Sequence, residues 1–295
     1  MKIKPWHQTN WDARAAGNFI GGGSGTGLLI FAALSNLAAL AGPAADYRWQ
    51  AGLALVLVAA GLASVFAEIG RPFRALNVFL HPHTSWMTRE AMVAPFLFGS
   101  GAVAICLGGG LFSVVAALLA AGYLYCQARM IAAAKGIPAW REPRIIPLFI
   151  ITGLVEGAGL SALIVAAQSG TAPRWLAAVL LVALILRRLA WKIYHETLER
   201  RGAPKKALEV LARLRGRFER YGQSLPEMLL VAALFFRSEQ VWLLPLAGAA
   251  ALLGGWLLKF TIVARAAYNQ GFALPVVPVR GQGQGMPGVK PGWSK

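Results

Sequence analysis

The sequence predicts an all-α, polytopic membrane protein, a bundle of about eight transmembrane helices. Of its 295 residues, 57% are hydrophobic and only 14% are charged, whereas a water-soluble domain carries about 25% charged residues. The charges are also unbalanced, because 29 Lys and Arg oppose 12 Asp and Glu and give a net charge of +17. These observations argue against a water-soluble enzyme and favour a chain dissolved in lipid.

Eight apolar stretches approach the length of about 20 residues that a bilayer-spanning helix needs. They cover residues 18–42, 50–69, 90–109, 111–134, 146–168, 174–194, 225–237 and 240–265. The seventh is the shortest, and the expected orientation depends on it. The first follows a basic start and resembles a cleavable signal, but it exceeds the hydrophobic region of about 7 to 15 residues that such a signal has. We therefore expect it to be the first membrane helix.

The basic residues sort unequally between the two ends of such a bundle. Arg48, Arg174 and Arg237 fall at one end, and the other 26 of the 29 Lys and Arg fall at the end that holds both termini. Lys and Arg concentrate on the cytoplasmic side of membrane proteins, so we expect an inner-membrane protein with both termini in the cytoplasm. A basic face that binds an acidic partner would give the same asymmetry. Membrane lipids are expected at this face, and nucleic acid is not.

The chain divides into a cytoplasmic segment, 1–17, a membrane domain, 18–269, and a C-terminal arm, 270–295. The arm is rich in Gly and Pro, which excludes a regular helix, so it is either disordered or extended along another subunit. Trp293 and the cluster of Val276, Val277 and Val279 favour the extended arm, because they need to be buried. Inside the membrane domain, the basic loop 195–223 contains an amphipathic stretch from Lys205 to Arg220. Such a helix lies in the headgroup plane, or it is solvated and binds nothing specific.

Redox cofactors are not expected in this chain. The two cysteines, Cys106 and Cys126, are far apart, whereas an iron–sulfur cluster needs several clustered thiolates. The four histidines lie in the N-terminal segment, in a loop or near a helix end, and none is placed to hold a haem between helices. We therefore expect neither haem nor an iron–sulfur cluster here.

The first span contains a run of glycines. Gly17, Gly21 and Gly25 recur every four residues, a spacing that lets a helix approach another helix very closely. The run matches no phosphate-binding motif and does not follow a strand, so a nucleotide site is not expected. A flat ligand such as a quinone ring could use the same surface, and Gly21 and Gly25 are therefore candidate quinone-binding residues.

Glu156 lies near the middle of the fifth span. Ionisable groups at membrane depth are costly and are commonly functional. We expect Glu156 to be protonated or to pair with a basic residue of the sixth or eighth span, either as a proton relay or as a structural bond. Arg187 and Lys259 lie near span ends, where snorkelling of their long side chains accounts for them.

The densest polar cluster connects the second and third spans. It runs from Glu68 to Glu90 and includes three arginines, His81 and His83. Such groups can bind a carbonyl oxygen and deliver protons to it. A metal site of the two histidines with a glutamate is disfavoured, since a single His-x-His is a weak pattern. A hydrated loop with helix caps and ion pairs is the simpler alternative, but it explains poorly why two glutamates stand at the membrane edge.

At these residues the chain resembles the membrane-anchor subunits of the DMSO reductase family, which are related to the polysulfide reductase and NrfD-type anchors. The family motif is matched by Gly70, Pro72, Arg74, Ala75, Asn77, Ser85 and Glu90. The family commonly has a histidine where this chain has Glu68. The resemblance implies a site for ubiquinone or menaquinone formed by Glu68, Arg74, Asn77, Ser85 and Glu90. Proton delivery would involve Glu68, Glu90, His81 and His83.

The resemblance also implies partners. A docked iron–sulfur subunit on the basic cytoplasmic face would exchange electrons with quinone through this subunit, and a molybdenum subunit would carry out catalysis. The cytoplasmic face and the Gly- and Pro-rich tail are similar to the phenylacetyl-CoA:acceptor oxidoreductase branch, which implies quinone reduction during phenylacetyl-CoA oxidation. The alternatives are a secondary transporter with Glu156 as coupling acid, whose inverted repeats are not evident, and a scaffold whose partner holds the quinone.

Overall fold

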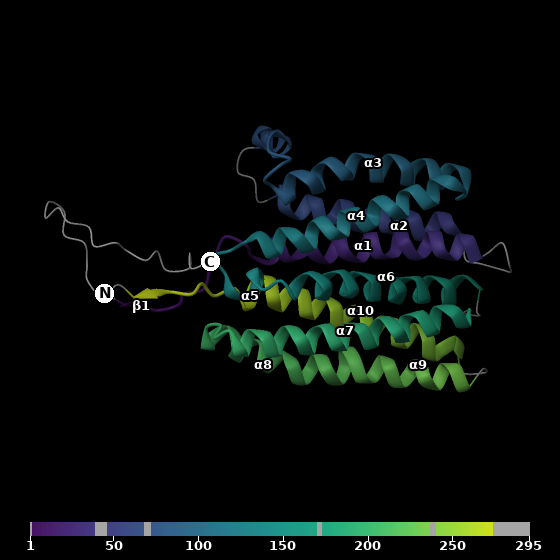
Figure 1. Cartoon of the computed structure of the whole chain (residues 1–295). Helices are drawn as coiled ribbons and strands as arrows, with labels where there is room; N and C mark the ends of the chain where they lie inside the picture. Colours follow the sequence, from purple (N-terminus) through teal and green to yellow (C-terminus); the bar gives the residue numbers. More distant parts are fainter. Residues whose placement is uncertain (1, 39–45, 68–71, 170–172, 237–239, 274–295) are drawn as a thin grey trace, which may run out of the picture.

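The computed structural model describes residues 2–38, 46–67, 72–169, 173–236 and 240–273. It is a bundle of long helices that run along one common direction (Figure 1), which confirms the all-α prediction. A short antiparallel pair of strands, β1 (Lys2–Ile3) and β2 (Phe272–Ala273), joins the N-terminal segment to the residues that follow the last helix. The predicted arm, 270–295, lies outside the described residues beyond Ala273.

Each of the eight predicted spans overlaps a helix, with ends that differ by a few residues. These helices are α1 (Ala13–Ala38), α2 (Tyr47–Phe66), α3 (Trp86–Leu107), α4 (Leu111–Ala133), α6 (Ile145–Ser169), α7 (Arg174–Arg200), α9 (Leu225–Phe235) and α10 (Gln240–Phe260). The connecting elements are the 3₁₀ helix η2 (Pro72–Leu80), α5 (Pro138–Arg141), α8 (Lys205–Arg217) and the π-helices η3 (Phe218–Ser224) and η4 (Thr261–Arg265).

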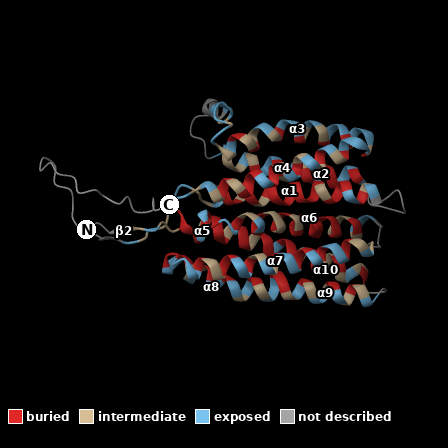
Figure 2. Cartoon of the chain, viewed as in Figure 1, coloured by how far each residue is buried: buried red, intermediate tan, exposed pale blue. Residues whose placement is uncertain are grey.

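Within the described ranges, six helices are long and apolar enough to cross a membrane: α1, α2, α3, α4, α6, and α10 together with η4. The chain is therefore a multi-pass membrane protein. Charged residues in its second half keep α7 out of this set, and α9 alone is too short. Large exposed hydrophobic side chains on the outer faces, such as Val56, Phe96, Val182 and Phe235, suit contact with lipid (Figure 2).

The bundle has two halves that meet along α1, α6 and α10. One half contains α1 to α4 and the other contains α6 to α10 (Figure 1). Helix α1 packs against α2, α4 and α6, while α10 packs against α6 and α9. Most of α1 and α6 is buried (Figure 2), so polar side chains on these two helices face protein rather than lipid.

The predicted basic loop 195–223 is mostly helical. Residues up to Arg200 belong to α7, and α8 continues through η3 into α9 as one long helix (Figure 1). This helix runs beside α7 and α10, so the amphipathic stretch does not lie across the bundle in the headgroup plane. Its apolar side, which includes Leu211 and Leu214, is buried against the rest of the bundle. Protein, rather than lipid, covers the apolar stripe.

The connections alternate between two ends of the bundle (Figure 1). Arg48 and Arg174 begin α2 and α7 at one end, and Arg237 lies outside the described residues. The N-terminal segment, α5 and the start of α8 lie at the other end, which we call the basic end. The side of the membrane that this end faces stays a prediction.

Candidate functional site

A cavity of about 820 Å³ lies at the basic end of the first half of the bundle. Side chains from α1, α2, η2 and α3 form most of its wall, and most of them are aliphatic or aromatic, such as Phe19, Leu62 and Phe66. The polar exceptions with an amide or carboxyl group are Asn18, Asn77 and Glu90. The cavity is therefore an apolar slot with a few polar groups, as in many small-molecule sites.

The start of α3 directs Glu90 into this cavity. Ser85 is the N-cap of the helix, and its side chain accepts a hydrogen bond from the Thr88 backbone N–H at 3.2 Å. The Thr88 hydroxyl donates to the Val78 carbonyl oxygen at 2.5 Å and thereby ties η2 to α3. Glu90 belongs to the buried stripe of α3 with Ala94 and Leu97 and is only 3% exposed.

Three polar side chains from other helices surround the Glu90 carboxyl group. The amide nitrogen of Gln127, on α4, donates to Glu90 Oε1 at 3.0 Å and to the Asn18 carbonyl oxygen at 3.1 Å. The Tyr123 hydroxyl and the Asn18 side chain lie beside the same carboxyl group. Asn18 Oδ1 is buried and has no hydrogen-bond partner among the described residues. Asn18 is also one of the residues that line the cavity, and a buried polar oxygen of this kind usually has a partner.

The sequence did not single out these three residues. Gln127 and Tyr123 are one turn apart on the buried face of α4, inside an apolar span where each polar group needs a partner. Asn18 stands at the predicted start of the first span. Polar residues inside apolar spans were the available signal, and their spacing of four residues placed Gln127 and Tyr123 on one helix face.

The predicted site residues are only partly brought together. Glu90 and Asn77 line the cavity, whereas Ser85 acts as the cap of α3 and does not line it. Glu68 lies outside the described residues, and so does the side chain of Arg74, whose backbone belongs to η2.

The two predicted proton-delivering histidines lie in the turn between η2 and α3. His81 and His83 are exposed and do not line the cavity. Their carbonyl oxygens hold the turn, because that of His81 accepts from the Ser85 backbone N–H at 3.0 Å and that of His83 accepts from Arg89 Nη2 at 2.9 Å. Both residues therefore lie at the surface, in the connection that leads into α3.

Gly21 and Gly25 lie at the contact between α1 and α2, away from the cavity. A Cβ atom at Gly21 would lie 2.6 Å from the Leu57 carbonyl oxygen, and one at Gly25 would lie 2.5 Å from the Ala54 carbonyl oxygen. The backbone of α2 therefore fills the space that a ligand would need. The glycine spacing serves helix packing at these two positions.

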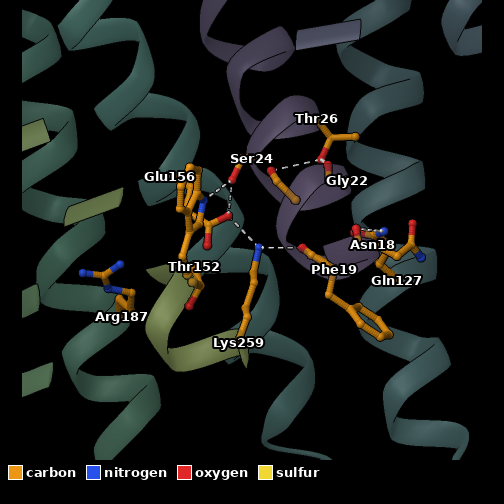
Figure 3. Close-up of polar contacts among 12 residues, drawn as sticks. Asn18, Phe19, Gly22, Ser24, Thr26, Gln127, Thr152, Glu156, Arg187 and Lys259 are labelled. Atoms are coloured by element: carbon orange, nitrogen blue, oxygen red, sulfur yellow. Dashed lines mark hydrogen bonds and ion pairs between the residues drawn. The ribbon is translucent and has the colours of Figure 1, made fainter. Parts of the chain in front are cut away.

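A second buried cluster lies where α1, α6 and α10 meet (Figure 3). Lys259 Nζ lies 2.6 Å from Glu156 Oε2 and donates to the Phe19 carbonyl oxygen at 3.0 Å. The Ser24 hydroxyl donates to the same carboxylate oxygen at 2.9 Å, and Trp256 Nε1 donates to Ser24 Oγ at 2.8 Å. The predicted pairing of Glu156 with the eighth span is confirmed. The predicted snorkelling of Lys259 is wrong, because its side chain is 1% exposed and points into the bundle.

Arg187 is also buried, against the snorkelling prediction. Its Nε donates to Gln223 Oε1 at 2.7 Å, its Nη1 donates to the Ala251 carbonyl oxygen at 2.9 Å, and its Nη2 donates to the Gly222 carbonyl oxygen. Gly222 and Gln223 belong to the π-helix η3, whose wider turn alters the usual backbone bonding. The guanidinium group therefore satisfies polar groups of other elements rather than reaching water.

The part of the chain that the structure describes contains no group of three or more His, Cys, Asp or Glu that could hold a metal ion. The buried acidic groups Glu90 and Glu156 instead bind side chains that donate hydrogen bonds. The cavity beside Glu90 has a titratable carboxyl group and the amide groups of Asn18 and Asn77 in its apolar wall. Such an arrangement can hold a polar head of an apolar molecule and exchange a proton with it.

No protein-family model matches the chain. The chain is similar to one subunit of a sulfite dehydrogenase from Allochromatium vinosum, with 30% identity over 167 residues. The match covers 48% of this chain and 50% of that protein, so the chain spans about half the length of the curated relative it matches.

Proposed function

We propose that this chain is the membrane subunit of an oxidoreductase complex and that it binds a quinone in the cavity beside Glu90. The observation that carries this proposal is the buried carboxyl group of Glu90 at the wall of an apolar cavity of about 820 Å³. Asn18 lines the same cavity, and its Oδ1 has no hydrogen-bond partner in the described part of the chain. The similarity to a sulfite dehydrogenase subunit supports the oxidoreductase part. The cavity, and the resemblance of the segment between Glu68 and Glu90 to the anchor-subunit motif, support the proposal that the ligand is a quinone.

The cavity fits a quinone in size and chemistry. Its volume lies within the range of about 300 to 1,000 Å³ that is usual for small-molecule sites. The aromatic and aliphatic wall suits a flat ring and an isoprenoid tail, and the amide and carboxyl groups suit its oxygens. Phe66 and Met87 line the cavity and are also exposed on the surface of the bundle, so a molecule dissolved in the membrane has a route into it.

A bound quinone would supply two-electron, two-proton redox chemistry. Glu90 holds or releases a proton at its carboxyl oxygens, and Gln127 orients that group by donating to Oε1. Asn18 binds and orients a polar head through its side chain amide. His81 and His83 are exposed and take up protons from water near the cavity. Glu68 and Arg74 are included as quinone-site residues only because the resemblance to the anchor subunits implies them.

The basic end is the proposed docking surface for an iron–sulfur subunit, with a molybdenum subunit beyond it. The cavity lies at that same end, where the end of α2 and the start of α3 line it, so a quinone bound there would lie at the end that the partner subunit contacts. This end lies in the cytoplasm if the charge distribution follows the usual rule. The resemblance implies phenylacetyl-CoA as the substrate of the complex, whereas the relative is named for sulfite.

The transporter alternative has less support. Glu156, its coupling acid, is held by Lys259 and Ser24 inside the bundle and does not line the cavity beside Glu90. A buried pair of this kind stabilises the contact between α6 and α10 without any transported ion. A scaffold without its own quinone would leave the polar groups around Glu90 unexplained.

The intact complex carrying Glu90→Gln tests the proposal. We expect quinone-linked turnover to be lost and turnover with a soluble dye to be retained, because the dye accepts electrons before they reach this subunit. Glu227→Gln is the matched control. Glu227 Oε2 lies 2.6 Å from Arg188 Nη2, and Glu227 does not line the cavity. Unchanged quinone-linked turnover in Glu90→Gln would refute the role of Glu90, and loss of both activities would indicate a failure of assembly.

A further inference from the structure

A second cavity, of about 520 Å³, lies at the basic end of the other half of the bundle. It is lined by Arg213 and Arg217 of α8 and by Arg265 of η4, and no Asp or Glu lines it. None of these three arginines forms an ion pair with a carboxylate within the described ranges. Three positive charges therefore converge on one cavity without a negative partner, an arrangement that favours an anionic ligand.

Contacts between distant parts of the chain build this cavity. Arg213 and Arg217 are one turn apart and share a face of α8. Arg265 ends the π-helix η4, and its guanidinium group lies 5.1 Å from the centre of the Phe260 ring. His7 Nε2 lies 2.9 Å from the Ala264 carbonyl oxygen, and the His7 ring packs edge-on against Tyr268 at 5.1 Å. The N-terminal segment thus forms one wall.

Exposed apolar side chains lie one turn from the cavity on α10 and η3, and we call them the apolar strip. Leu257 lines the cavity, and Leu253, one turn earlier on α10, is exposed. Tyr221, one turn after Arg217, is exposed as well. Between them, Gly222 and Gly254 bring η3 and α10 into close backbone contact. A free phosphate ion would use the arginines but not this strip, whereas a lipid would use both.

We propose that this cavity binds the phosphate headgroup of an anionic phospholipid, with the acyl chains lying along the strip between η3 and α10. Arginine binds phosphate oxygens through two parallel N–H donors, and basic pockets at the ends of membrane helices suit anionic headgroups. Three guanidinium groups can serve more than one phosphate. A lipid with two phosphates should therefore bind more tightly than a lipid with one.

Native mass spectrometry of the purified full-length chain in detergent tests this proposal. The added lipids are tetraoleoyl cardiolipin, dioleoyl phosphatidylglycerol and dioleoyl phosphatidylcholine. We expect cardiolipin to bind more tightly than phosphatidylglycerol, and phosphatidylcholine to bind least. Arg213→Gln/Arg217→Gln should weaken cardiolipin binding by about tenfold or more, since each basic residue near an anionic headgroup contributes on the order of 1 kcal/mol.

Lys205→Gln/Lys206→Gln is the matched control, because both lysines are exposed on α8, do not line the cavity, and the change in charge is the same. Cardiolipin binding should stay within about twofold of the wild type. Arg265→Gln on a different element should also weaken binding, and it tests the cavity if the double variant does not fold.

Three results would overturn the proposal. Equal weakening in the cavity and control variants would mean that net charge alone attracts the lipid. Complete displacement of cardiolipin by millimolar inorganic phosphate would identify a simple anion site. Lipid binding that is unchanged in all the arginine variants would show that the cavity does not hold the lipid.

Discussion

Gln127 and Lys259 donate hydrogen bonds to the carbonyl oxygens of neighbouring residues on α1. Gln127 Nε2 lies 3.1 Å from the Asn18 carbonyl oxygen, and Lys259 Nζ lies 3.0 Å from that of Phe19. Gln127 also donates to Glu90, and Lys259 also donates to Glu156 (Figure 3). One short segment of α1 therefore positions both buried carboxyl groups, each through a side chain from a different helix.

Removal of the Lys259 amine should destabilise the protein strongly. Lys259→Met leaves the Glu156 carboxyl group buried without its cation, and breaking a buried pair in this way costs about 3–5 kcal/mol. The double variant Lys259→Met/Glu156→Gln should recover part of the loss, because no uncompensated charge remains. Unfolding monitored by heating in detergent measures both effects.

Arg188→Met provides the comparison for that measurement. Arg188 pairs with Glu227 through a partly exposed side chain, and such pairs contribute about 0–1 kcal/mol. A loss of stability as large as that of Lys259→Met would show that burial does not distinguish the two pairs.

Loss of the Gln127 amide should impair quinone-linked turnover selectively. Gln127→Leu removes the donor to Glu90 Oε1 and leaves a buried carboxyl oxygen without its partner, a change worth about 1–3 kcal/mol. We expect quinone-linked turnover to fall by about tenfold or more, with dye-linked turnover unchanged. Equal quinone-linked turnover in Gln127→Leu and the wild type would mean that Glu90 needs no orientation by α4.

Trp11 offers a direct reading of ligand binding, because it lines the cavity beside Glu90. A short-chain quinone added to the purified chain should quench tryptophan fluorescence, and Trp11→Phe should remove part of that quenching. Trp242, which is exposed on α10, supplies the control through Trp242→Phe. Identical quenching in the two variants would place the quinone elsewhere.

Substitution of an α1 glycine that faces α2 by a residue with a side chain should destabilise the protein. A Cβ atom at Gly25 would lie 2.5 Å from the Ala54 carbonyl oxygen, and overpacking of this kind costs about 1–3 kcal/mol. Gly99 on α3 has open space at the same atom. We therefore expect Gly25→Ala to lower the unfolding temperature and Gly99→Ala to leave it equal or higher, since alanine favours a helix more than glycine.

Local composition predicted the helices because a membrane span depends on the hydropathy of consecutive residues. The same reasoning identified Glu156 as a group in need of a partner, because a carboxyl group at membrane depth is costly whatever surrounds it. The motif between Glu68 and Glu90 also directed attention to the region where the cavity lies. These conclusions need no knowledge of how the helices pack.

Packing decided which side chains meet. The positions of Arg187 and Lys259 in the sequence indicated how deep each residue lies, but not the direction in which its side chain points. Snorkelling of both side chains towards water was therefore consistent with the sequence. Their actual partners come from α6, α10 and η3, which are far away in the chain. Likewise, the apolar stripe of α8 suits lipid and protein equally, since both are apolar, and only the neighbouring helices show that protein covers it. Composition along one chain determines what must be buried, whereas the contacts between helices determine what buries it.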